Sequence, residues 1–485
     1  MSKMNVQAGS IKDFRQNDEP LGLFAFEEGG IAAPFLSNAA KKEINAALED
    51  EGFKGKAGET ASLRASDGET SRRLLVVGLG KKKGFTADCQ RKAAAALFGA
   101  AKTRFKSIWF SAPGDLQAAA EGLMLAAYSF NKYTEPCKDR KLESAVLLTQ
   151  KAGEKSKAQA ALERAALFAE AVCWVRDLVN DGPSDQSPEA LMKTAKKEIG
   201  GGVTLKVIDK KEAEKLGMGS FLAVGRGSSQ PPFMLHFTYK PKGKAKKKIA
   251  LVGKGVVFDS GGLSLKPAAS METMKCDMAG AATVLAVMRV LPRLGVKAEV
   301  HAITPLTYNM TGGDAIKPGD VVKASNGKTI EILNTDAEGR LILADALVYA
   351  SKLKFDLIVD LATLTGAAVV ALGNDVTAAM TNDRAALQKL LGVAKKTQEQ
   401  IWELPLVEDY KKQIKSKVAD LKNIGNRGEA GTITAGLFLQ EFVDAKSWIH
   451  LDIAGPAWTD GGGDYCRPGG TGTMVRTLLE YLTTL

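Results

Sequence analysis

Residues 249–267 read IALVGKGVVFDSGGLSLKP, and this stretch decides the expected fold. A short apolar run, typical of a buried β-strand, leads into a glycine-rich loop that carries Lys254, Asp259 and Lys266. In open α/β sheets, ligands bind outside the carboxyl ends of the strands. The stretch therefore predicts an α/β sheet with a functional site at its strand ends.

Two further segments place acidic residues at similar positions. MKCDMAGAATVLAVM (residues 274–288) puts Asp277 just before an Ala-rich helix. EILNTDAEGRLILADAL (residues 331–347) runs from a strand into Asp336 and Glu338 and then into a helix. Taken singly, these acids are equally well explained as helix N-caps or as first-turn acids that the helix dipole favours.

Taken together, the acids favour a metal centre. We expect four carboxylates to converge at the strand-end edge of one sheet, within glycine-rich loops. Clustered anions repel one another unless cations neutralise them, and hard divalent cations do so best. Lys266 and Arg340 would then remain to act on a substrate. The chain has only three histidines, so the metal site must be built mainly from carboxylates.

The length of 485 residues predicts two domains. The expected fold class is α/β, with two domains that each contain a mixed or mostly parallel sheet flanked by helices, joined by a long connector helix. The expected bounds are 1–155 for the N-terminal domain, 156–182 for the connector and 183–485 for the catalytic domain. Strand-like runs of the second domain alternate with helical runs, and they are residues 203–207, 233–237, 248–252, 299–303, 329–333 and 357–360.

The composition, 45% hydrophobic and 25% charged, is that of a globular protein without a membrane span. The first residues show no apolar secretory core, and the five cysteines are widely spaced, so we expect a cytoplasmic protein. The net charge of +11 leaves two interpretations, a nucleic-acid surface or simple solubility. The densest lysine cluster, residues 241–248, lacks aromatic residues and is predicted to be a solvated hairpin tip.

The motifs also resemble a known family. NTDAEGRL (residues 334–341) matches the signature of the leucine aminopeptidase, or cytosol aminopeptidase, family. VGKGVVFDSGG (residues 252–262), DLATLTGAA (residues 360–368) and HLDIAGPAW (residues 450–458) are similar to further blocks of that family, in the same order. The resemblance extends from Arg176 to the C-terminus. The N-terminal domain, expected to be macro-like with a role in regulation or assembly, resembles the family only in size and α/β pattern.

The resemblance implies two zinc or manganese ions in each subunit. Asp259 and Glu338 would bridge the ions. Asp336 would bind one of them, and Asp277 together with the amine of Lys254 would bind the other. A lysine ligand must be neutral, so this role requires a strongly lowered pKa for Lys254.

The resemblance further implies a peptidase mechanism and a homohexamer. Lys266 would polarise the scissile carbonyl, and Arg340 would hold a bicarbonate ion that acts as general base. The substrates would be peptides with leucine or another apolar residue at the N-terminus. The substrate site would be formed by Met274, Asp277, Thr363, Gly366, Ala454 and Ala457.

Three other interpretations remain open at this point. The sequence DSGG at residues 259–262 resembles the nucleophile loop of trypsin-type serine proteases, with Ser260 as nucleophile. A nucleic-acid-binding accessory role fits the positive charge and is compatible with peptidase activity. A structural pseudoenzyme is opposed by the complete set of ligand residues. Cys276 is expected to be buried filler, and the glycine-rich loop at residues 459–467 leaves fine specificity undecided.

Overall fold

The computed structural model of the protein describes residues 4–66, 70–135, 139–149 and 152–485. These residues form two compact units. The N-terminal unit comprises Met1–Cys173 with Gly461–Pro468, and the C-terminal unit comprises Trp174–Asp460 with Gly469–Leu485. The division falls within helix α5 (Ala152–Asn180). Both units contain a sheet flanked by helices, which confirms the predicted fold class; the predicted domain bounds stay a prediction.

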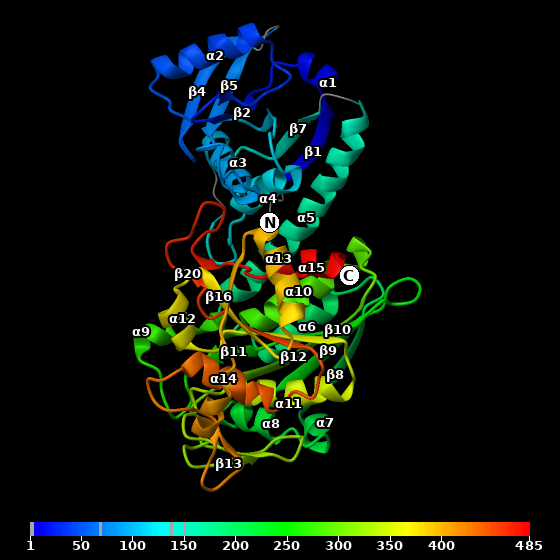
Figure 1. Ribbon diagram of the computed structural model, residues 1–485, viewed down its shortest axis with the longest axis vertical. Helices are drawn as coiled ribbons and strands as arrows, with labels where there is room; N and C mark the ends of the chain where they lie inside the picture. The colour runs from blue at the N-terminus through cyan, green and yellow to red at the C-terminus, as the bar shows by residue number, and fades with distance from the viewer. Residues whose placement is uncertain (1–3, 67–69, 136–138, 150–151) are drawn as a thin grey trace. The chain divides into compact units, whose positions relative to one another are not determined.

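A seven-stranded sheet forms the centre of the N-terminal unit (Figure 1). Its strands are β1 (Asn5–Ser10), β2 (Leu21–Phe26), β3 (Gly30–Ile31), β4 (Thr60–Ser66), β5 (Ser71–Gly78), β6 (Ser107–Phe110) and β7 (Ser144–Thr149). The order is β1-β7-β6-β2-β5-β4, with β3 beside β2. All neighbouring pairs are parallel except β4 with β5 and β3 with β2.

Helices cover both faces of this sheet. They are α1 (Ile11–Arg15), α2 (Asn38–Asp50), α3 (Ala87–Ala101), α4 (Leu116–Ala126) and the first part of α5. Side chains on a strand point alternately to the two faces. In β5, Leu75 and Val77 accordingly pack with α3, α4 and α5, whereas Leu74 and Val76 pack with α2. The unit therefore has two apolar cores, one on each side of the sheet.

A nine-stranded sheet forms the centre of the C-terminal unit. Its strands are β8 (Thr204–Ile208), β9 (Phe233–Tyr239), β10 (Lys248–Gly253), β11 (Gly255–Asp259), β12 (Glu299–Asn309), β15 (Leu357–Ala362), β16 (Val376–Thr381), β17 (Gln400–Glu403) and β19 (Trp448–Asp452). The order is β17-β16-β19-β15-β10-β12-β9-β8, and β11 pairs with the C-terminal part of β12. The central strands β19, β15, β10 and β12 are parallel. Their carboxyl ends therefore meet at one edge.

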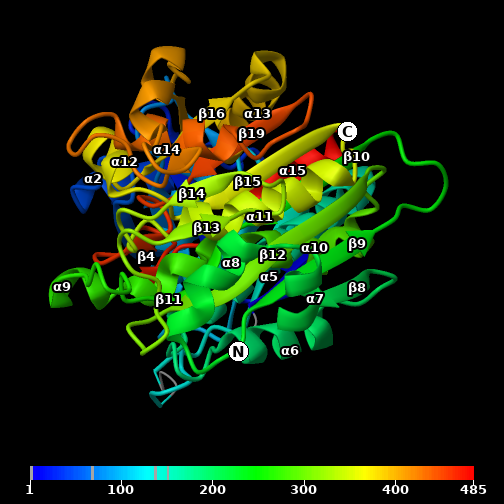
Figure 2. The same ribbon diagram turned by 90° about the horizontal axis from the view of Figure 1, so that it is seen from below.

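Two layers of helices flank this sheet (Figure 2). Helix α10 packs on β10, β12 and β15 and contacts α15, whereas α11 packs on β10 and β12 and contacts α8 and α14. The helices are α6 (Pro188–Glu198), α7 (Lys210–Lys215), α8 (Gly219–Val224), α9 (Ala268–Met271), α10 (Ala279–Leu294), α11 (Gly339–Lys352), α12 (Gly366–Leu372), α13 (Arg384–Thr397), α14 (Gly431–Gln440) and α15 (Val475–Thr483). Short 3₁₀ helices are η1 (Gly225–Gly227), η2 (Met274–Met278) and η3 (Glu408–Ile414).

Helix α10 begins directly against the strand ends, because glycines occupy the contact. A Cβ atom on Gly280 would lie 2.3 Å from the carbonyl oxygen of Leu361 in β15. A Cβ atom on Gly253, at the end of β10, would lie 2.5 Å from the carbonyl oxygen of Gly280. Real Cβ atoms do not approach backbone so closely, so these two positions require glycine. The close approach brings the segment before α10 next to the ends of β10 and β15.

Two sequence-based expectations about strands are wrong. The run at 329–333 forms β14 (Thr329–Glu331), which lies in a separate three-stranded sheet with β13 (Val321–Lys323) and β18 (Leu421–Lys422). The acids that follow β14 therefore do not leave the same sheet as Asp259. The lysine-rich segment connects β9 to β10 but is no hairpin tip, because both strands pair with β12, which lies between them. A further small sheet joins β20 (Trp458–Thr459) to β21 (Gly469–Gly470).

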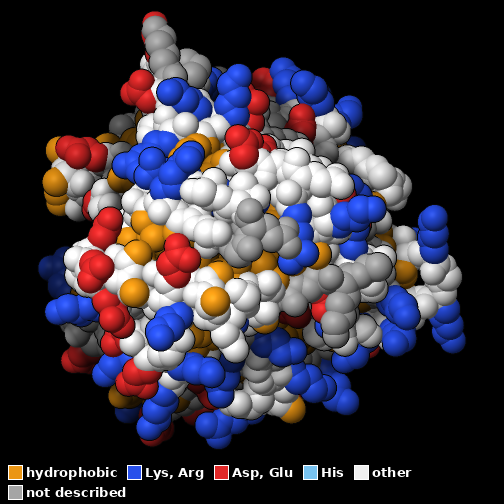
Figure 3. Space-filling model, turned by 90° about the horizontal axis from the view of Figure 1, so that it is seen from above, with side chains coloured by type: hydrophobic (Ala, Val, Ile, Leu, Met, Phe, Trp, Pro, Cys, Tyr) orange, Lys and Arg blue, Asp and Glu red, His pale blue; other side chains and the backbone are white. Residues whose placement is uncertain are grey.

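Charged side chains are mixed on the molecular surface. On the face drawn in Figure 3, Lys and Arg side chains are spread among Asp and Glu side chains and do not gather into one stripe. Among the helices that the structure describes, none combines the length and the apolar character needed to cross a bilayer.

Candidate metal centre

The five predicted metal ligands lie together in the C-terminal unit. Lys254 lies between β10 and β11, Asp259 ends β11, and Asp277 lies in η2 just before α10. Asp336 and Glu338 lie in the loop that joins β14 to α11. Backbone hydrogen bonds hold Lys254 between β15 and α10. The sequence prediction that these residues converge is therefore met, although two different sheets supply them.

Lys254 is buried and surrounded by carboxylates. Its Nζ atom lies 2.7 Å from Asp277 Oδ1 and 2.9 Å from Glu338 Oε1, and it donates a hydrogen bond of 2.8 Å to the carbonyl oxygen of Thr363. Burial alone would lower the pKa of Lys254, but Asp277, Glu338 and Asp259 outweigh burial and raise the pKa above its ordinary value. The Lys254 ammonium thus balances these carboxylates in the protein itself. The neutral amine that the family resemblance implies would require bound cations to supply the positive charge instead.

Lys266 forms the second cationic contact of the cluster. Its Nζ atom lies 2.9 Å from Asp259 Oδ2 and 2.5 Å from Asp336 Oδ1. Burial opposes the charge of Lys266, but the two carboxylates prevail and raise its pKa. The side chain is 15% exposed, so the ammonium can reach a molecule in the adjoining solvent.

Three carboxylates converge on one point between these lysines. Asp259, Asp336 and Glu338 each offer an oxygen, and these oxygens lie within 4.8 Å of one another. Burial, together with the charge of Asp259, raises the pKa of Glu338 to about 8. Burial likewise raises the pKa of Asp277 to about 6, although Lys254 acts in the opposite direction. The cluster therefore lacks enough positive charge of its own.

Two buried oxygens of the cluster point to an additional ligand. Glu338 Oε2 and Asp277 Oδ2 have no hydrogen-bond partner among the residues that the structure describes. A buried carboxylate oxygen without a partner is costly, by roughly 1–3 kcal/mol or more. Carboxylate oxygens are the ligands that hard divalent cations prefer. The donor set thus fits divalent cations.

Helix capping does not explain these acids. The N-cap positions of α10 and α11 are Met278 and Glu338, and neither side chain accepts a capping hydrogen bond. Asp277 instead accepts from Lys254 and from the hydroxyl of Thr363, at 2.7 Å each. The capping alternative is therefore wrong for α10 and α11.

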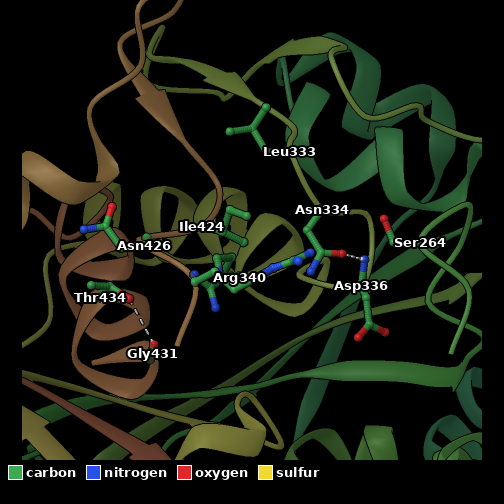
Figure 4. A pocket seen from close by; sticks show the side chains of 11 residues that line it. Ser264, Leu333, Asn334, Asp336, Arg340, Ile424, Asn426, Gly431 and Thr434 are labelled. Carbon is green, nitrogen blue, oxygen red and sulfur yellow. Dashed lines mark hydrogen bonds between the residues drawn. The ribbon is translucent and has the colours of Figure 1, made fainter. Parts of the chain in front are cut away.

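Arg340 lies in the first turn of α11, beside a cavity of about 380 Å³ that also contains Asp336 (Figure 4). Its Nη1 atom donates to the carbonyl oxygen of Asn423 at 2.8 Å, whereas Nε has no partner among the described residues. Burial lowers the pKa of Arg340 to about 10, so the guanidinium remains a cation at neutral pH. The geometry leaves this cation available to an anion.

Residues 173–479 match the catalytic domain of the cytosol aminopeptidase family, and residues 21–136 match its N-terminal domain. The chain belongs to the cytosol aminopeptidase family. Probable cytosol aminopeptidases of Thermosynechococcus vestitus and Aquifex aeolicus are 44% and 41% identical to it, over 96% and 99% of each chain. The nucleic-acid alternative gains no support from these comparisons.

Two solved structures of similar proteins extend the comparison. The bottromycin maturation enzyme BotP in complex with Mn is 36% identical, has a TM-score of 0.86 and covers 96% of this chain and 99% of its own. A mutant of tomato leucine aminopeptidase is 33% identical, has a TM-score of 0.88 and covers 100% of this chain and 97% of its own. The fold and the family therefore agree.

The residues predicted to form the substrate site lie on three neighbouring segments of this cytosol aminopeptidase. Met274 shares η2 with Asp277, and Thr363 is hydrogen-bonded to Asp277 as described above. Gly366 begins α12, three residues after Thr363. Ala454 and the buried Ala457 follow β19, whose end is bonded to the end of β15. Their joint role as a substrate pocket stays a prediction.

The serine-protease interpretation is wrong. The Ser260 hydroxyl is buried and donates to the carbonyl oxygen of Asn309 at 2.7 Å. None of the three histidines, all of which the structure describes, hydrogen-bonds to Ser260: His450 pairs with Asp360, and His236 pairs with His301. Cys276 is buried as expected, and burial raises the pKa of its thiol to about 12, so it remains protonated.

Three residues that hold the proposed ligands in place were not predicted from the sequence. Asn309 Nδ2 donates to Asp259 Oδ1 at 2.8 Å and to the carbonyl oxygen of Thr335 at 3.0 Å, which links β12 to the loop before α11. Asn423 bonds the same loop through its side chain, and Asp452 bonds the segment that follows β15. Asn309 and Asp452 end β12 and β19, but the strand predicted at 299–303 stops before Asn309 and no strand was predicted before Asp452, so no pattern pointed to them.

Proposed function

We propose that this aminopeptidase removes leucine and other apolar residues from the N-terminus of peptides with the help of two divalent cations. Its family makes it a metal-dependent aminopeptidase and a hydrolase. The observation that carries the finer proposal is the pair of unpartnered buried oxygens, Glu338 Oε2 and Asp277 Oδ2, beside the convergent carboxylates. Such a donor set is best explained by more than one cation, because four carboxylates face only two lysines.

We assign the cations, as Zn²⁺ or Mn²⁺, to ligands according to the resemblance of the motifs. Asp259 and Glu338 would contact both ions. Asp336 would bind one ion, and Asp277 with Lys254 would bind the other. When bound, the cations would lower the pKa of water and polarise the scissile carbonyl.

The protein's own side chains would complete the reaction. The Asp277 carboxylate would accept a hydrogen bond from the free α-amino group of the substrate, which limits cleavage to the first residue. Lys266 would donate to the carbonyl oxygen as negative charge develops there. Arg340 would hold a bicarbonate ion, and this ion would accept the proton of the attacking water. The unpartnered Nε atom of Arg340 supports this last role.

The preference for apolar residues would come from the pocket that follows Thr363. Met274, Gly366, Ala454 and Ala457 offer no charge to a side chain bound among them. The family resemblance also leads us to propose a homohexamer in the cytoplasm. Sedimentation of the purified protein at the mass of six chains would support the assembly.

Hydrolysis of leucine p-nitroanilide tests the function directly. The purified protein would be assayed after treatment with a chelator and again after adding back Mn²⁺ or Zn²⁺. We expect activity to disappear on chelation and to return with metal. Activity that is indifferent to the chelator would contradict the carboxylate metal site.

A further inference from the structure

The cavity beside the carboxylate cluster contains a second arginine, which the mechanism above does not use. Its charged lining residues are Asp336, Arg340 and Arg427. Asp336 is already paired with Lys266, and Arg340 is assigned to bicarbonate under the proposed function, so the guanidinium of Arg427 is the positive charge of the cavity that remains to be used. The volume of about 380 Å³ is within the range of small-ligand sites. The cavity is therefore suited to an anionic group.

Asn423 directly precedes residues 424–427, which line the cavity. Its buried side chain accepts from the backbone N–H of Leu333 at 2.8 Å and donates to the carbonyl oxygen of Asn334 at 2.6 Å. Its carbonyl oxygen accepts from Arg340, as described above. The segment that carries Arg427 therefore begins at a residue that is hydrogen-bonded both to the loop before α11 and to α11 itself.

The segment around Arg427 is held on both sides. The backbone N–H of Asn426 donates to Gln413 Oε1 at 3.1 Å, and the Asn426 side chain donates to Glu429 Oε2 at 3.1 Å. Gly428 between them has a φ of +81°, a conformation that favours glycine. The backbone that bears Arg427 is therefore ordered by its own contacts before any ligand binds.

The guanidinium of Arg427 is left without a partner. It makes no hydrogen bond and no ion pair with any residue in the described parts of the chain, and the nearest acid in sequence, Glu429, is engaged by Asn426. The residue is exposed at the cavity that Asp336 and Arg340 share with it. An unpaired arginine on a backbone segment that is fixed by its own contacts is suited to binding a carboxylate through two parallel hydrogen bonds.

The position of the cavity indicates which part of a peptide reaches Arg427. Under the proposed function, the first residue of the substrate lies beside Asp277 and Thr363. None of the residues assigned to that pocket lines the cavity, whereas Asp336 belongs to both the cavity and the carboxylate cluster. Under this function, the residue that follows the scissile bond would therefore enter the cavity.

We propose that Arg427 binds a carboxylate carried by the residue that follows the scissile bond, which makes dipeptides, or peptides with an acidic second residue, favoured substrates. This inference rests on the proposed function. The carboxylate has two chemical sources, the C-terminus of a dipeptide and the side chain of an acidic second residue. Both present the same planar anion to the guanidinium.

Paired substrates test the proposal. Leucyl-glycine has a C-terminal carboxylate, which leucyl-glycinamide replaces with an amide. In the second pair the C-terminus is an amide in both peptides, and the second residue is aspartate in one and asparagine in the other. We expect the wild-type protein to favour the acid over the amide in kcat/KM by about threefold to tenfold. In Arg427→Gln this ratio should fall to near one, and Arg427→Lys should retain part of it. Whichever pair responds identifies the source of the carboxylate.

A matched control separates this effect from general surface charge. Arg384 is 81% exposed and pairs with Glu403 outside the cavity, so Arg384→Gln should keep the wild-type ratio. A ratio that is unchanged in Arg427→Gln, or a wild-type protein that treats acid and amide alike in both pairs, would overturn the proposal.

Binding of an uncleavable ligand distinguishes this proposal from the proposed function. The analogue of leucyl-glycine with a reduced peptide bond, as acid and as amide, would be titrated into wild-type and Arg427→Gln protein by calorimetry. If the protein cleaves no peptide but binds the acid more tightly than the amide, and this difference is lost in Arg427→Gln, the carboxylate site is supported and the proposed function fails. Cleavage with equal binding of acid and amide would leave the function standing and overturn the site.

Discussion

Glu338 is the acid whose change should have the largest effect on the centre. It is buried, it lies between Lys254 and the other carboxylates, and one of its oxygens has no partner among the described residues. Glu338→Gln keeps the size of the side chain but removes the charge that a cation needs. We expect kcat on leucine p-nitroanilide to fall by at least about a hundredfold, with less metal retained per subunit.

Metal content measured by atomic absorption, alongside the rate, checks this expectation. Glu331→Gln is the matched control, because Glu331 lies in β14 and accepts from Ser416 outside the cluster. A Glu338→Gln protein with full metal content and full rate would show that Glu338 is not part of the metal centre.

Asp452 is expected to position the substrate pocket. Its fully buried carboxylate accepts from the backbone N–H groups of Leu364 and Ala454, both at 3.1 Å, and from the Thr365 hydroxyl at 2.6 Å. Asp452→Ala leaves these donors unpaired, so we expect a loss of about 3 kcal/mol of unfolding free energy and a higher KM for leucine p-nitroanilide.

Asp452→Asn provides the informative comparison. Its amide oxygen can still accept from both backbone groups, so stability and KM should recover in part. The measurement is the ratio of kcat/KM for leucine and alanine p-nitroanilides, which loosening of the pocket would reduce. An Asp452→Ala protein that unfolds earlier but keeps this ratio would show that Asp452 only stabilises the fold.

At the scale of elements, the contact between α10 and β15 should tolerate no side chain. Gly280→Ala would place its Cβ 2.3 Å from a backbone oxygen, which cannot move as a flexible side chain does. We expect a loss of at least about 2 kcal/mol, measured by urea unfolding. Gly392→Ala is the control: Gly392 lies inside α13 with no atom within 4 Å of its virtual Cβ, so this change should add about 0.5–1 kcal/mol.

Local patterns in the sequence were sufficient to predict that the acids converge, but not to find the residues that hold them. Asp336 and Glu338 stand in one contiguous motif, and the strand before Asp259 has a strong apolar signal. β14 was assigned to the main sheet because its three residues carry no information about their partner strand. The role of Asn423 could not be predicted from local sequence, because its hydrogen-bond partners Leu333 and Asn334 are 90 and 89 residues away along the chain.

At the scale of the whole molecule, a buried histidine chain should make stability depend on pH. His236 Nε2 lies 2.7 Å from His301 Nδ1, and His236 Nδ1 lies 3.0 Å from the Tyr349 hydroxyl. His301 Nε2 lies 2.7 Å from Glu299 Oε1. Burial, together with the charges of His301, Lys206 and Lys248, lowers the pKa of His236 to about 4. Burial also lowers the pKa of His301, although Glu299 opposes it.

His236 is therefore neutral in the folded protein at pH 5, whereas the unfolded chain binds a proton below about pH 6.5. Stability from this residue is complete above that pH and is lost as the pH falls towards 4. We expect a loss of about 2 kcal/mol at pH 5 relative to pH 8. Urea unfolding at both pH values checks it, and His236→Gln should show a smaller difference. Equal differences in the two proteins would exclude His236 as the source.

The placement of β19 between β15 and β16 has a consequence for synthesis on the ribosome. Every proposed metal ligand has been translated by Glu338, but the strand that completes the middle of the sheet ends only at Asp452. At ordinary elongation rates, translation from the end of β15 to the end of β19 takes roughly 5 to 20 s, and during this time one edge of β15 has no partner strand. A nascent chain that stalls in this interval carries the whole ligand set beside an unpaired apolar strand. Such a product is a substrate for chaperones before it is an enzyme.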